Sequence, residues 1–317
     1  MRRTIGGRAF DFEREVAVMA VVNRTPDSFY DKGSTFALDR AVEAAVRAAE
    51  QGADWVDIGG VPFGRGPAVS LQEELDRVVP VVAGIHERSD VVISVDTTRA
   101  EVARASIAEG ASVVNDTSGL HDPGMLAVLA GSSAQLVVTH SVGAPRSEPV
   151  APQYDDVVAE VIEHLRVRVE RARAAGVPDD RLIVDPGHDL NKNTLHTLEL
   201  TRRLGELGVL GLPVLAAVSN KDFIGETLDR PQGERLEGSL AAAVICILNG
   251  ARIVRMHDVR QAVDAVRLTE AVLGWRAPAF LRHNTAADPA AVAAAATATA
   301  AGSAGTAGAS GATAVGA

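Results

Sequence analysis

The chain has 317 residues, of which 47% are hydrophobic and 23% are charged, and its formal net charge is -10. This length and composition are those of a globular protein with one large core. The acidic balance and the lack of any Lys/Arg-rich run argue against a nucleic-acid partner and against an anionic membrane surface, because both need a basic face.

The single cysteine, Cys246, lies in an apolar stretch, so neither a disulfide framework nor a cysteine-ligated metal can form within one chain. The basic start, MRRTIGGRAF, is followed by the charged residues of segment 11–15 and not by the apolar run of a signal peptide. Other segments are too short or too polar to span a bilayer. We therefore expect a cytoplasmic protein.

Short β-branched runs alternate with longer amphipathic segments from the N-terminus to about residue 275, which is the pattern of βαβ units. The expected strands are residues 17–22, 54–58, 91–95, 112–114, 135–139, 181–184, 213–218 and 251–255. The expected helices are residues 38–51, 70–88, 99–109, 123–130, 155–175, 194–207, 234–249 and 258–273. Eight strands, each followed by its own helix, predict an α/β protein with the TIM (β/α)8 barrel fold.

The sequence also suggests how the chain is divided. Residues 1–16 precede the first expected strand and form an N-terminal extension, and residues 17–275 form the barrel. Segment 285–317 consists almost entirely of Ala, Gly, Thr and Ser, so we expect a disordered low-complexity tail. A Rossmann fold fits less well, because no G-x-G-x-x-G follows the first strand.

Polar residues close nearly every expected strand. They are Asn23, Gly59 with Gly60, Asp96, Asn115 with Asp116, His140, Asp185, Ser219 to Lys221, and Arg255 with His257. Any one of them is more often a helix cap or turn former than a ligand contact. In a TIM barrel, however, the strand ends meet at one mouth, where so many charged groups would perturb each other. The set therefore predicts a ligand site.

The charges within this set are sorted by strand. Lys221, Arg255 and His257 follow strands seven and eight, where TIM barrels frequently hold phosphate, whereas Asp96 and Asp185 follow strands three and six. This arrangement predicts a ligand with two unlike ends. One end is an anion such as a phosphate, and the other is a heterocycle that donates hydrogen bonds to carboxylates.

Eight segments of the chain resemble dihydropteroate synthase. They are NRTPDSF (23–29), DIGG (57–60), SVDT (94–97), ND (115–116), DPG (185–187), SNK with IGETL (219–228), ERLEGSLA (234–241) and RMHDV (255–259). The resemblance covers residues 17–273, and the ordered series is far more specific than any single motif. It implies a pterin-binding TIM barrel that joins 6-hydroxymethyl-7,8-dihydropterin diphosphate to p-aminobenzoate and releases pyrophosphate.

The resemblance also implies roles for single residues. The pterin would be held by Asp96, Asn115, Asp185 and Lys221. The diphosphate would be held by Asn23, Arg255 and His257 together with Mg2+, a hard ion that favours oxygen ligands such as that of Asn23. Catalysis would come from positioning and from fixed charges, and the protein would be a homodimer that binds small-molecule substrates.

Departures from the family's pattern lie on the side of the acceptor amine. The family's loop close to GGESTRPG reads GGVPFGRGPAV here, and Arg65 stands one position late. Leu190 replaces an aromatic residue expected against the p-aminobenzoate ring. The family's Ser-Arg-Lys-Ser becomes Ser219, Asn220, Lys221 and Asp222. This change removes a cation and brings a carboxylate near the expected carboxylate of the acceptor, which it should repel.

Four alternatives to the synthase stay open. Two follow from these departures: a synthase paralogue with an altered acceptor, and a silent pterin binder, like the diverged second synthase-like proteins of actinobacteria. The third is a methyltetrahydrofolate-binding methyltransferase domain, which would not need Arg255 and His257 for a diphosphate. His188, Asp189 and His196 could serve a metal hydrolase, but their spacing fits no zinc motif, and roles in a turn and on a helix face are favoured.

Overall fold

The computed structural model describes residues 1–23, 34–61, 67–142 and 152–284. The chain separates into two compact units, Met1–Val266 and Arg267–Ala317. The first unit carries every strand in the described part of the chain. The predicted tail, residues 285–317, lies outside the described residues, and the boundaries expected from the sequence stay predictions.

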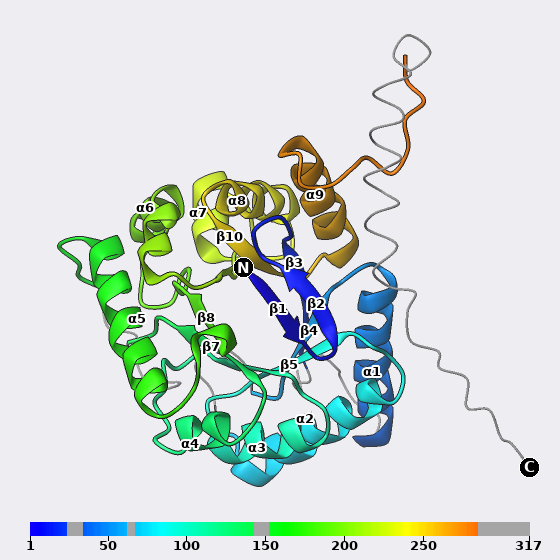
Figure 1. Ribbon diagram of the computed structural model, residues 1–317, viewed down its shortest axis with the longest axis vertical. Helices are drawn as coiled ribbons and strands as arrows, with labels where there is room; N and C mark the ends of the chain where they lie inside the picture. Colours follow the sequence, from blue (N-terminus) through cyan, green and yellow to red (C-terminus); the bar gives the residue numbers. More distant parts are fainter. Residues whose placement is uncertain (24–33, 62–66, 143–151, 285–317) are drawn as a thin grey trace, which may run out of the picture. The chain divides into compact units, whose positions relative to one another are not determined.

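The first unit is built on a closed barrel of eight parallel strands (Figure 1). The strands are β3 (Ala17–Asn23), β4 (Trp55–Gly59), β5 (Val92–Asp96), β6 (Val113–Asp116), β7 (Gln135–Thr139), β8 (Leu182–Asp185), β9 (Val214–Ala216) and β10 (Ala251–Met256). Each strand pairs with the next along the chain, and β10 closes the barrel by pairing with both β9 and β3. The predicted TIM barrel is thereby confirmed.

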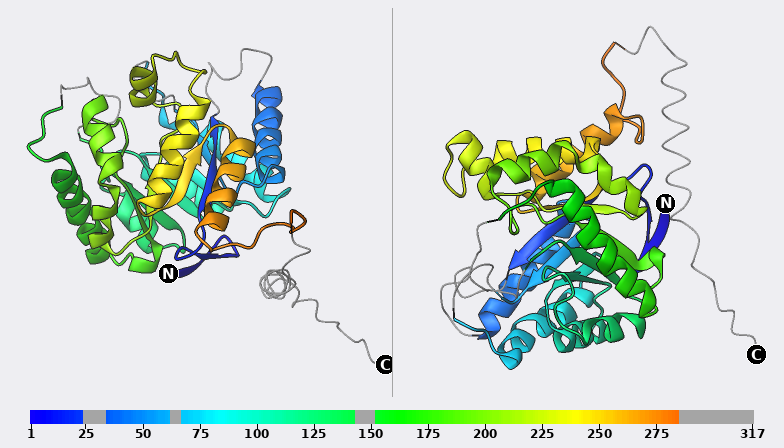
Figure 2. Two further views of the ribbon diagram at one scale, coloured as in Figure 1. Left: turned by 90° about the horizontal axis from the view of Figure 1, so that it is seen from above. Right: turned by 90° about the vertical axis from the view of Figure 1, so that its left-hand side faces the viewer.

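Helices surround the strands on the outside of the barrel (Figure 2). The α-helices are α1 (Ser34–Glu50), α2 (Leu71–His86), α3 (Ala100–Ala108), α4 (Met125–Ala130), α5 (Val157–Ala174), α6 (Thr194–Arg202), α7 (Asp222–Leu228), α8 (Leu236–Leu248) and α9 (Val259–Val272). Two 3-10 helices are η2 (Asp179–Arg181) and η3 (Leu204–Leu210). In the described part of the chain, no helix is long and apolar enough to cross a membrane.

Two of these helices differ from the expectation. The helix expected at 194–207 ends as α6 at Arg202, and the chain continues as η3. Helix α7 was not expected, because its seven residues are too few to show a helical period. It nevertheless matters for the site, since it begins directly after Lys221.

The N-terminal extension forms a β-hairpin of β1 (Arg2–Ile5) and β2 (Arg8–Asp11). Its two-residue turn is Gly6-Gly7, and both glycines have positive φ, 55° and 78°. Such a turn matches the twist of the paired strands and requires residues that tolerate positive φ. A short glycine turn therefore sets the register in which Ile5 pairs with Arg8.

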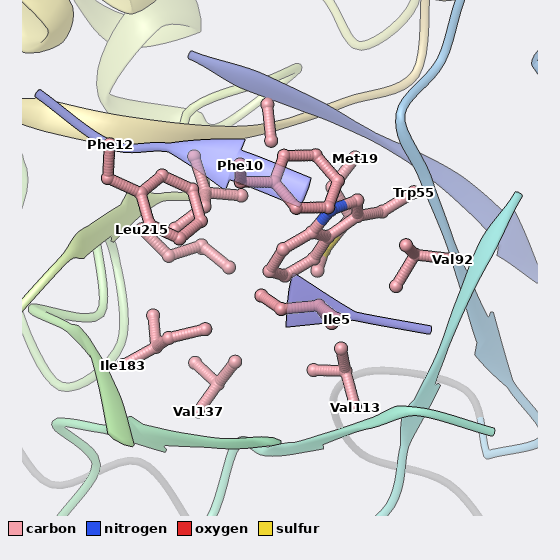
Figure 3. Close-up of a cluster of buried hydrophobic side chains, with 12 residues drawn as sticks. Ile5, Phe10, Phe12, Met19, Trp55, Val92, Val113, Val137, Ile183 and Leu215 are labelled. Atoms are coloured by element: carbon pink, nitrogen blue, oxygen red, sulfur yellow. The ribbon is translucent and has the colours of Figure 1, made fainter. Parts of the chain in front are cut away.

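The hairpin contributes to a buried apolar cluster inside the amino-terminal end of the barrel, called here the bottom cluster (Figure 3). Its members are Ile5, Phe10, Phe12, Ala17, Met19, Trp55, Val92, Val113, Val137, Ile183, Leu215 and Ile253. The Phe10 ring meets Trp55 edge to face at 5.8 Å and stacks on Phe12 at 5.8 Å. The barrel is thus sealed at this end by aromatic packing.

The interior changes character within two residues along the strands. Side chains alternate across a strand, so residues two apart face the same way and lie about 6.6 Å apart along the strand. Two positions after members of the bottom cluster stand Asp57, Ser94, Asn115, Thr139, Asp185 and Arg255. The strand faces that form the bottom cluster therefore carry a layer of polar side chains at the carboxyl-terminal mouth of the barrel.

Candidate active site

Strand register brings the residues at the ends of β3 to β6 into one row at the mouth. Asn23 pairs with Gly59, Gly59 with Asp96, and Asp96 with Asn115. On the other side of the barrel Asp185 pairs with Thr139. The backbone of Asn23 lies in this row, whereas its side chain lies outside the described residues.

Asp57, in the middle of β4, is the centre of the polar layer. It is fully buried, and its Oδ1 accepts a hydrogen bond from Ser94 Oγ at 2.6 Å. Its Oδ2 accepts from Asn115 Nδ2 at 3.0 Å and from Arg255 Nε at 2.7 Å. Three strands besides its own therefore meet at this carboxylate. The sequence had shown the DIGG segment but no role for Asp57.

Arg255 bridges two carboxylates from different strands. Besides Asp57, it contacts Asp96, with Nη2 to Oδ2 at 3.2 Å, and Thr117 Oγ1 donates to the other Asp96 oxygen at 3.2 Å. Burial, followed by repulsion from Asp57, raises the pKa of Asp96 to about 7, although Arg255 opposes the rise. Burial alone would lower the pKa of Arg255, but the two carboxylates raise it instead. Arg255 is therefore charged at any physiological pH.

Two further members of the predicted pterin set lie in this layer. Asn115 is buried, and its Oδ1 accepts no hydrogen bond from the described residues. Asp185 accepts from the backbone N–H of Gly187 at 2.7 Å. Burial raises the pKa of Asp185, opposed by that hydrogen bond and by the charge of Lys221. A buried amide oxygen and a buried carboxylate thus remain able to accept hydrogen bonds from a ligand.

The turn between β8 and α6, residues 186–193, keeps the shape of a glycine-rich turn with other side chains. Gly187, Asp189 and Asn191 have φ of 67°, 63° and 52°. A side chain at Gly187 would collide with the carbonyl oxygen of His140. Asp and Asn are among the few other residues that adopt positive φ readily, so these side chains fit the backbone of the turn.

Lys192 fixes this turn from within. Its Nζ donates to the carbonyl oxygens of Gly187 and Leu190, both at 3.0 Å, and lies 2.9 Å from Nδ1 of His140. Burial lowers the pKa of Lys192 to about 7, and it also lowers the pKa of His140 to about 2. The neutral imidazole is thus the third acceptor for the amine. Lys192 was not among the predicted site residues, because its three partners come together only when the turn folds against His140.

His257 and Ser219 join the loops after β10 and β9. Ser219 Oγ lies 3.0 Å from Nδ1 of His257 and accepts from its backbone N–H at 3.2 Å. Because β9 and β10 are neighbours in the barrel, Lys221, Arg255 and His257 lie on one side of the mouth. The structure therefore brings together the three residues that follow strands seven and eight in the sequence. Burial, followed by the charge of Arg255, lowers the pKa of His257 to about 4, so the cations of this side are Lys221 and Arg255.

The acceptor-side residues are divided between the turn after β8 and the start of α7. Leu190 is half-buried in the turn. Asn220, with φ of 59°, accepts from Gly233 N at 3.2 Å and so supports the segment before α8. Asp222 is 84% exposed and forms an ion pair of 2.9 Å with Arg235. Arg65 lies outside the described residues.

The metal-hydrolase interpretation finds no support in the described residues. His188 is buried beside Phe223, with Nε2 3.9 Å from Cys246 Sγ. His196 forms a capping box with Asn193 at the start of α6. Throughout the ranges that the structure describes, no group of three His, Cys, Asp or Glu side chains is placed to hold a metal ion.

The comparisons with known proteins agree with this geometry. Residues 19–257 match the pterin binding enzyme family. The chain is 44% identical over 284 residues to the inactive dihydropteroate synthase 2 of Mycobacterium leprae (strain TN), and the matched region covers 88% of this chain and 97% of that relative. It is 42% identical over 257 residues to the dihydropteroate synthase of Escherichia coli (strain K12), with 81% and 91% covered.

Solved structures show the same likeness. Xanthomonas albilineans dihydropteroate synthase with 4-aminobenzoic acid has a TM-score of 0.80 and 40% identity, and the same enzyme with 7,8-dihydropteroate has 0.75 and 37%. Each comparison covers 86% of this chain and 98% of the other. The chain therefore belongs to the dihydropteroate synthase family of pterin-binding transferases, as the order of its motifs predicted.

Proposed function

We propose that this chain binds 6-hydroxymethyl-7,8-dihydropterin diphosphate at the mouth of its barrel and transfers the pterin methylene to an arylamine. The observation that carries the proposal is the buried network of Asp57, Arg255, Asp96 and Asn115. Buried charges and an amide oxygen without a donor cost stability, so a set of them at the mouth of a TIM barrel is typical of a ligand site.

The pterin end would lie against Asp96, Asn115, Asp185 and Lys221. The pterin ring carries N–H and amino donors, and these residues offer two carboxylates and the open Asn115 Oδ1 as acceptors. Hydrogen bonds from the ligand would offset the burial that raises the pKa of Asp185. The pterin would thus stabilise a site that is electrostatically costly without it.

The diphosphate end would lie against Arg255 and His257, with Asn23 beside them. Arg255 is held in the mouth by two carboxylates and presents a fixed positive charge. Mg2+ would be bound mainly through phosphate oxygens, with Asn23 as a protein ligand, because this hard ion keeps few protein ligands and favours oxygen. Such an ion would neutralise charge on the leaving pyrophosphate.

In this reaction the C–O bond between the pterin methylene and the diphosphate breaks, and its electron pair leaves with pyrophosphate. The lone pair of the arylamine nitrogen forms the new C–N bond, and the nitrogen then loses a proton to solvent. The residues of the mouth hold the methylene and the leaving group in place, and the positive charge of Arg255 stabilises the negative charge that develops on the leaving oxygen.

A second candidate is a silent pterin binder. It is favoured by the altered side chains of residues 186–193 and by the 44% identity to the Mycobacterium leprae relative, which is named inactive. It would keep the pterin set without turnover of any amine. The methyltransferase alternative is disfavoured, because it has no diphosphate for Arg255 to bind.

Calorimetry and a pyrophosphate-release assay separate these functions. We expect pterin diphosphate to bind in the presence of Mg2+ and an arylamine to trigger pyrophosphate release, and Asp185→Asn to abolish both. Binding without release for every arylamine tried would establish the silent binder. Failure of the wild-type protein to bind pterin diphosphate would contradict both candidates.

We further propose a homodimer formed through helix α8. Ile245 and Leu248, three residues apart on this helix, are 46% and 59% exposed, and Leu195 on the neighbouring α6 is 74% exposed. A second copy would cover this apolar surface. Sedimentation should show a dimer that Leu248→Glu converts to a monomer, and a wild-type monomer at micromolar concentration would contradict it. The cytoplasmic location stays a prediction.

A further inference from the structure

We propose that Asp189 is a specificity-determining residue that disfavours an acceptor with a carboxylate, so that the second substrate is an arylamine without negative charge. This inference rests on the proposed pterin transfer and names the chemical class of its acceptor. It rests on the position of Asp189, which lies in the turn after β8 and contacts the start of α7.

The carboxylate of Asp189 is held in place from both sides. Its Oδ2 accepts a hydrogen bond from the backbone N–H of Phe223 in α7 at 3.2 Å. Its own backbone N–H donates to Thr197 Oγ1 in α6 at 3.3 Å, and its φ is 63°. The negative charge is therefore a fixed part of the site and does not belong to a mobile surface side chain.

This carboxylate acts on the positive charge of Lys221. Burial lowers the pKa of Lys221, and the largest opposing influence is the negative charge of Asp189, ahead of that of Asp185. Lys221 thus has a resident counter-charge before any substrate binds. An additional carboxylate from an acceptor would meet a positive charge that is already neutralised.

Arg235 also has a partner. It is paired at 2.9 Å with Asp222, the first residue of α7, whereas Arg255 is assigned to the diphosphate. Lys221 and Arg235 therefore each have a carboxylate of the protein as their counter-charge. An anionic acceptor would add uncompensated negative charge beside Asp189, whereas a neutral amine would not.

Asp189 is also close enough in the chain to act on the acceptor. It lies four residues after Asp185, which belongs to the proposed pterin set, and next to Leu190, which the resemblance places against the acceptor ring. Lys192 ties the carbonyl oxygens of Gly187 and Leu190 together, so these positions move as one turn. The acceptor ring and the Asp189 charge would thus share one wall.

The variant Asp189→Asn removes the negative charge of this side chain and keeps its size and shape. Asn is nearly isosteric, tolerates positive φ, and offers an amide oxygen to the backbone N–H of Phe223. The matched control is Asp264→Asn, which removes a carboxylate of helix α9 that is 69% exposed and paired with Arg260. Both variants should fold as the wild-type protein does.

The experiment is a calorimetric titration of the complex with unreactive 6-hydroxymethylpterin, pyrophosphate and Mg2+. Two probes of equal ring size are added, neutral 4-aminobenzamide and anionic p-aminobenzoate. We expect the wild-type protein to bind the amide at least tenfold more tightly than the acid. Asp189→Asn should bring the two affinities within threefold of each other, and Asp264→Asn should leave the tenfold gap.

Three results would overturn the inference: equal affinities in the wild-type protein, a gap that survives Asp189→Asn, or binding of neither probe to the pterin complex. Failure of the proposed function itself looks different. In that case 6-hydroxymethylpterin would not bind when it is titrated into the protein before either probe is added. Circular dichroism and thermal unfolding of both variants would separate these results from a folding defect.

Discussion

The bottom and the mouth of the barrel are built from the same strands, two residues apart, and they obey opposite rules. At the bottom, Trp55 and Ile183 pack against the hairpin with no exposed surface. At the mouth, Asp57 and Asp185 follow them on the same strand faces and bury charge instead. The difference teaches that one strand can supply stability at one end and a costly ligand site at the other.

The largest expected effect lies at the bottom. Phe10→Ala removes a 5% exposed ring that contacts Trp55 and Phe12, so it should lower the free energy of unfolding by about 3–5 kcal/mol. Pterin binding by the folded variant should stay within twofold of the wild type. Urea unfolding and calorimetry measure the two quantities, and a large loss of pterin affinity would break the proposed separation of the two ends.

At the mouth the effect should appear in binding. Asp57→Asn removes the charge-assisted contact of 2.7 Å to Arg255, which is worth about 1.5–3 kcal/mol, or roughly 10-fold to 100-fold in affinity for pterin diphosphate. Ser94→Ala, which removes only a neutral donor to the same carboxylate, is the control and should cost less. If both variants bind as the wild type does, Asp57 does not position Arg255.

Asp57 and Lys192 are site residues that could not be predicted from the sequence. The strand runs predicted the barrel and the polar residues that close each strand, because alternation and strand ends are local signals. Asp57 lies two residues inside its strand, and its contacts to Ser94, Asn115 and Arg255 exist only after the barrel closes. Lys192 was missed for the same reason.

The hairpin and Arg235 show two other limits of prediction from the sequence. The Gly6-Gly7 turn between two short runs is a hairpin signal, but it was not among the predicted elements. The position of Asp222 near the carboxylate of the acceptor stays a prediction. Its pairing with Arg235, 13 residues later, depends on the path of the chain between α7 and α8, which no local pattern reveals.

Buried histidines near the mouth predict a smaller, pH-dependent effect. Burial lowers the pKa of His140 to about 2 and that of His188 to about 3, below the ordinary value of 6.5. The folded state therefore binds fewer protons, and stability is full above pH 6.5 and is lost as the pH falls below it. Asp96, with its pKa raised to about 7, contributes in the opposite sense, losing stability as the pH rises from about 4 to 7.

Unfolding at pH 7.5 and pH 5.5 measures the balance of these groups. The wild-type protein should be less stable at pH 5.5, by about 1 kcal/mol for each buried histidine before the opposing contribution of Asp96 is counted. His188→Leu should reduce the difference between the two pH values, because it removes one of the buried imidazoles. Equal pH dependence in the wild type and His188→Leu would show that His188 does not titrate on unfolding.

The smallest effect should come from the rim of the mouth. Asp222 is 84% exposed, so its pair with Arg235 is screened by water, and Asp222→Asn should change the free energy of unfolding by less than about 0.5 kcal/mol. Thermal unfolding of this variant beside the wild type measures the change. A loss above 2 kcal/mol would mean that the ion pair, and not only the buried network, supports the mouth.

The hairpin has a consequence for the order of folding. It precedes every barrel strand in the chain, yet Arg3 hydrogen-bonds to the carbonyl oxygens of Asp179 and Leu182, roughly half the chain away. Its apolar residues have no complete partner until the later strands exist, and the contacts that hold it span large sequence separations, which slow folding. The residues that precede the barrel in sequence are therefore among the last to reach their native contacts.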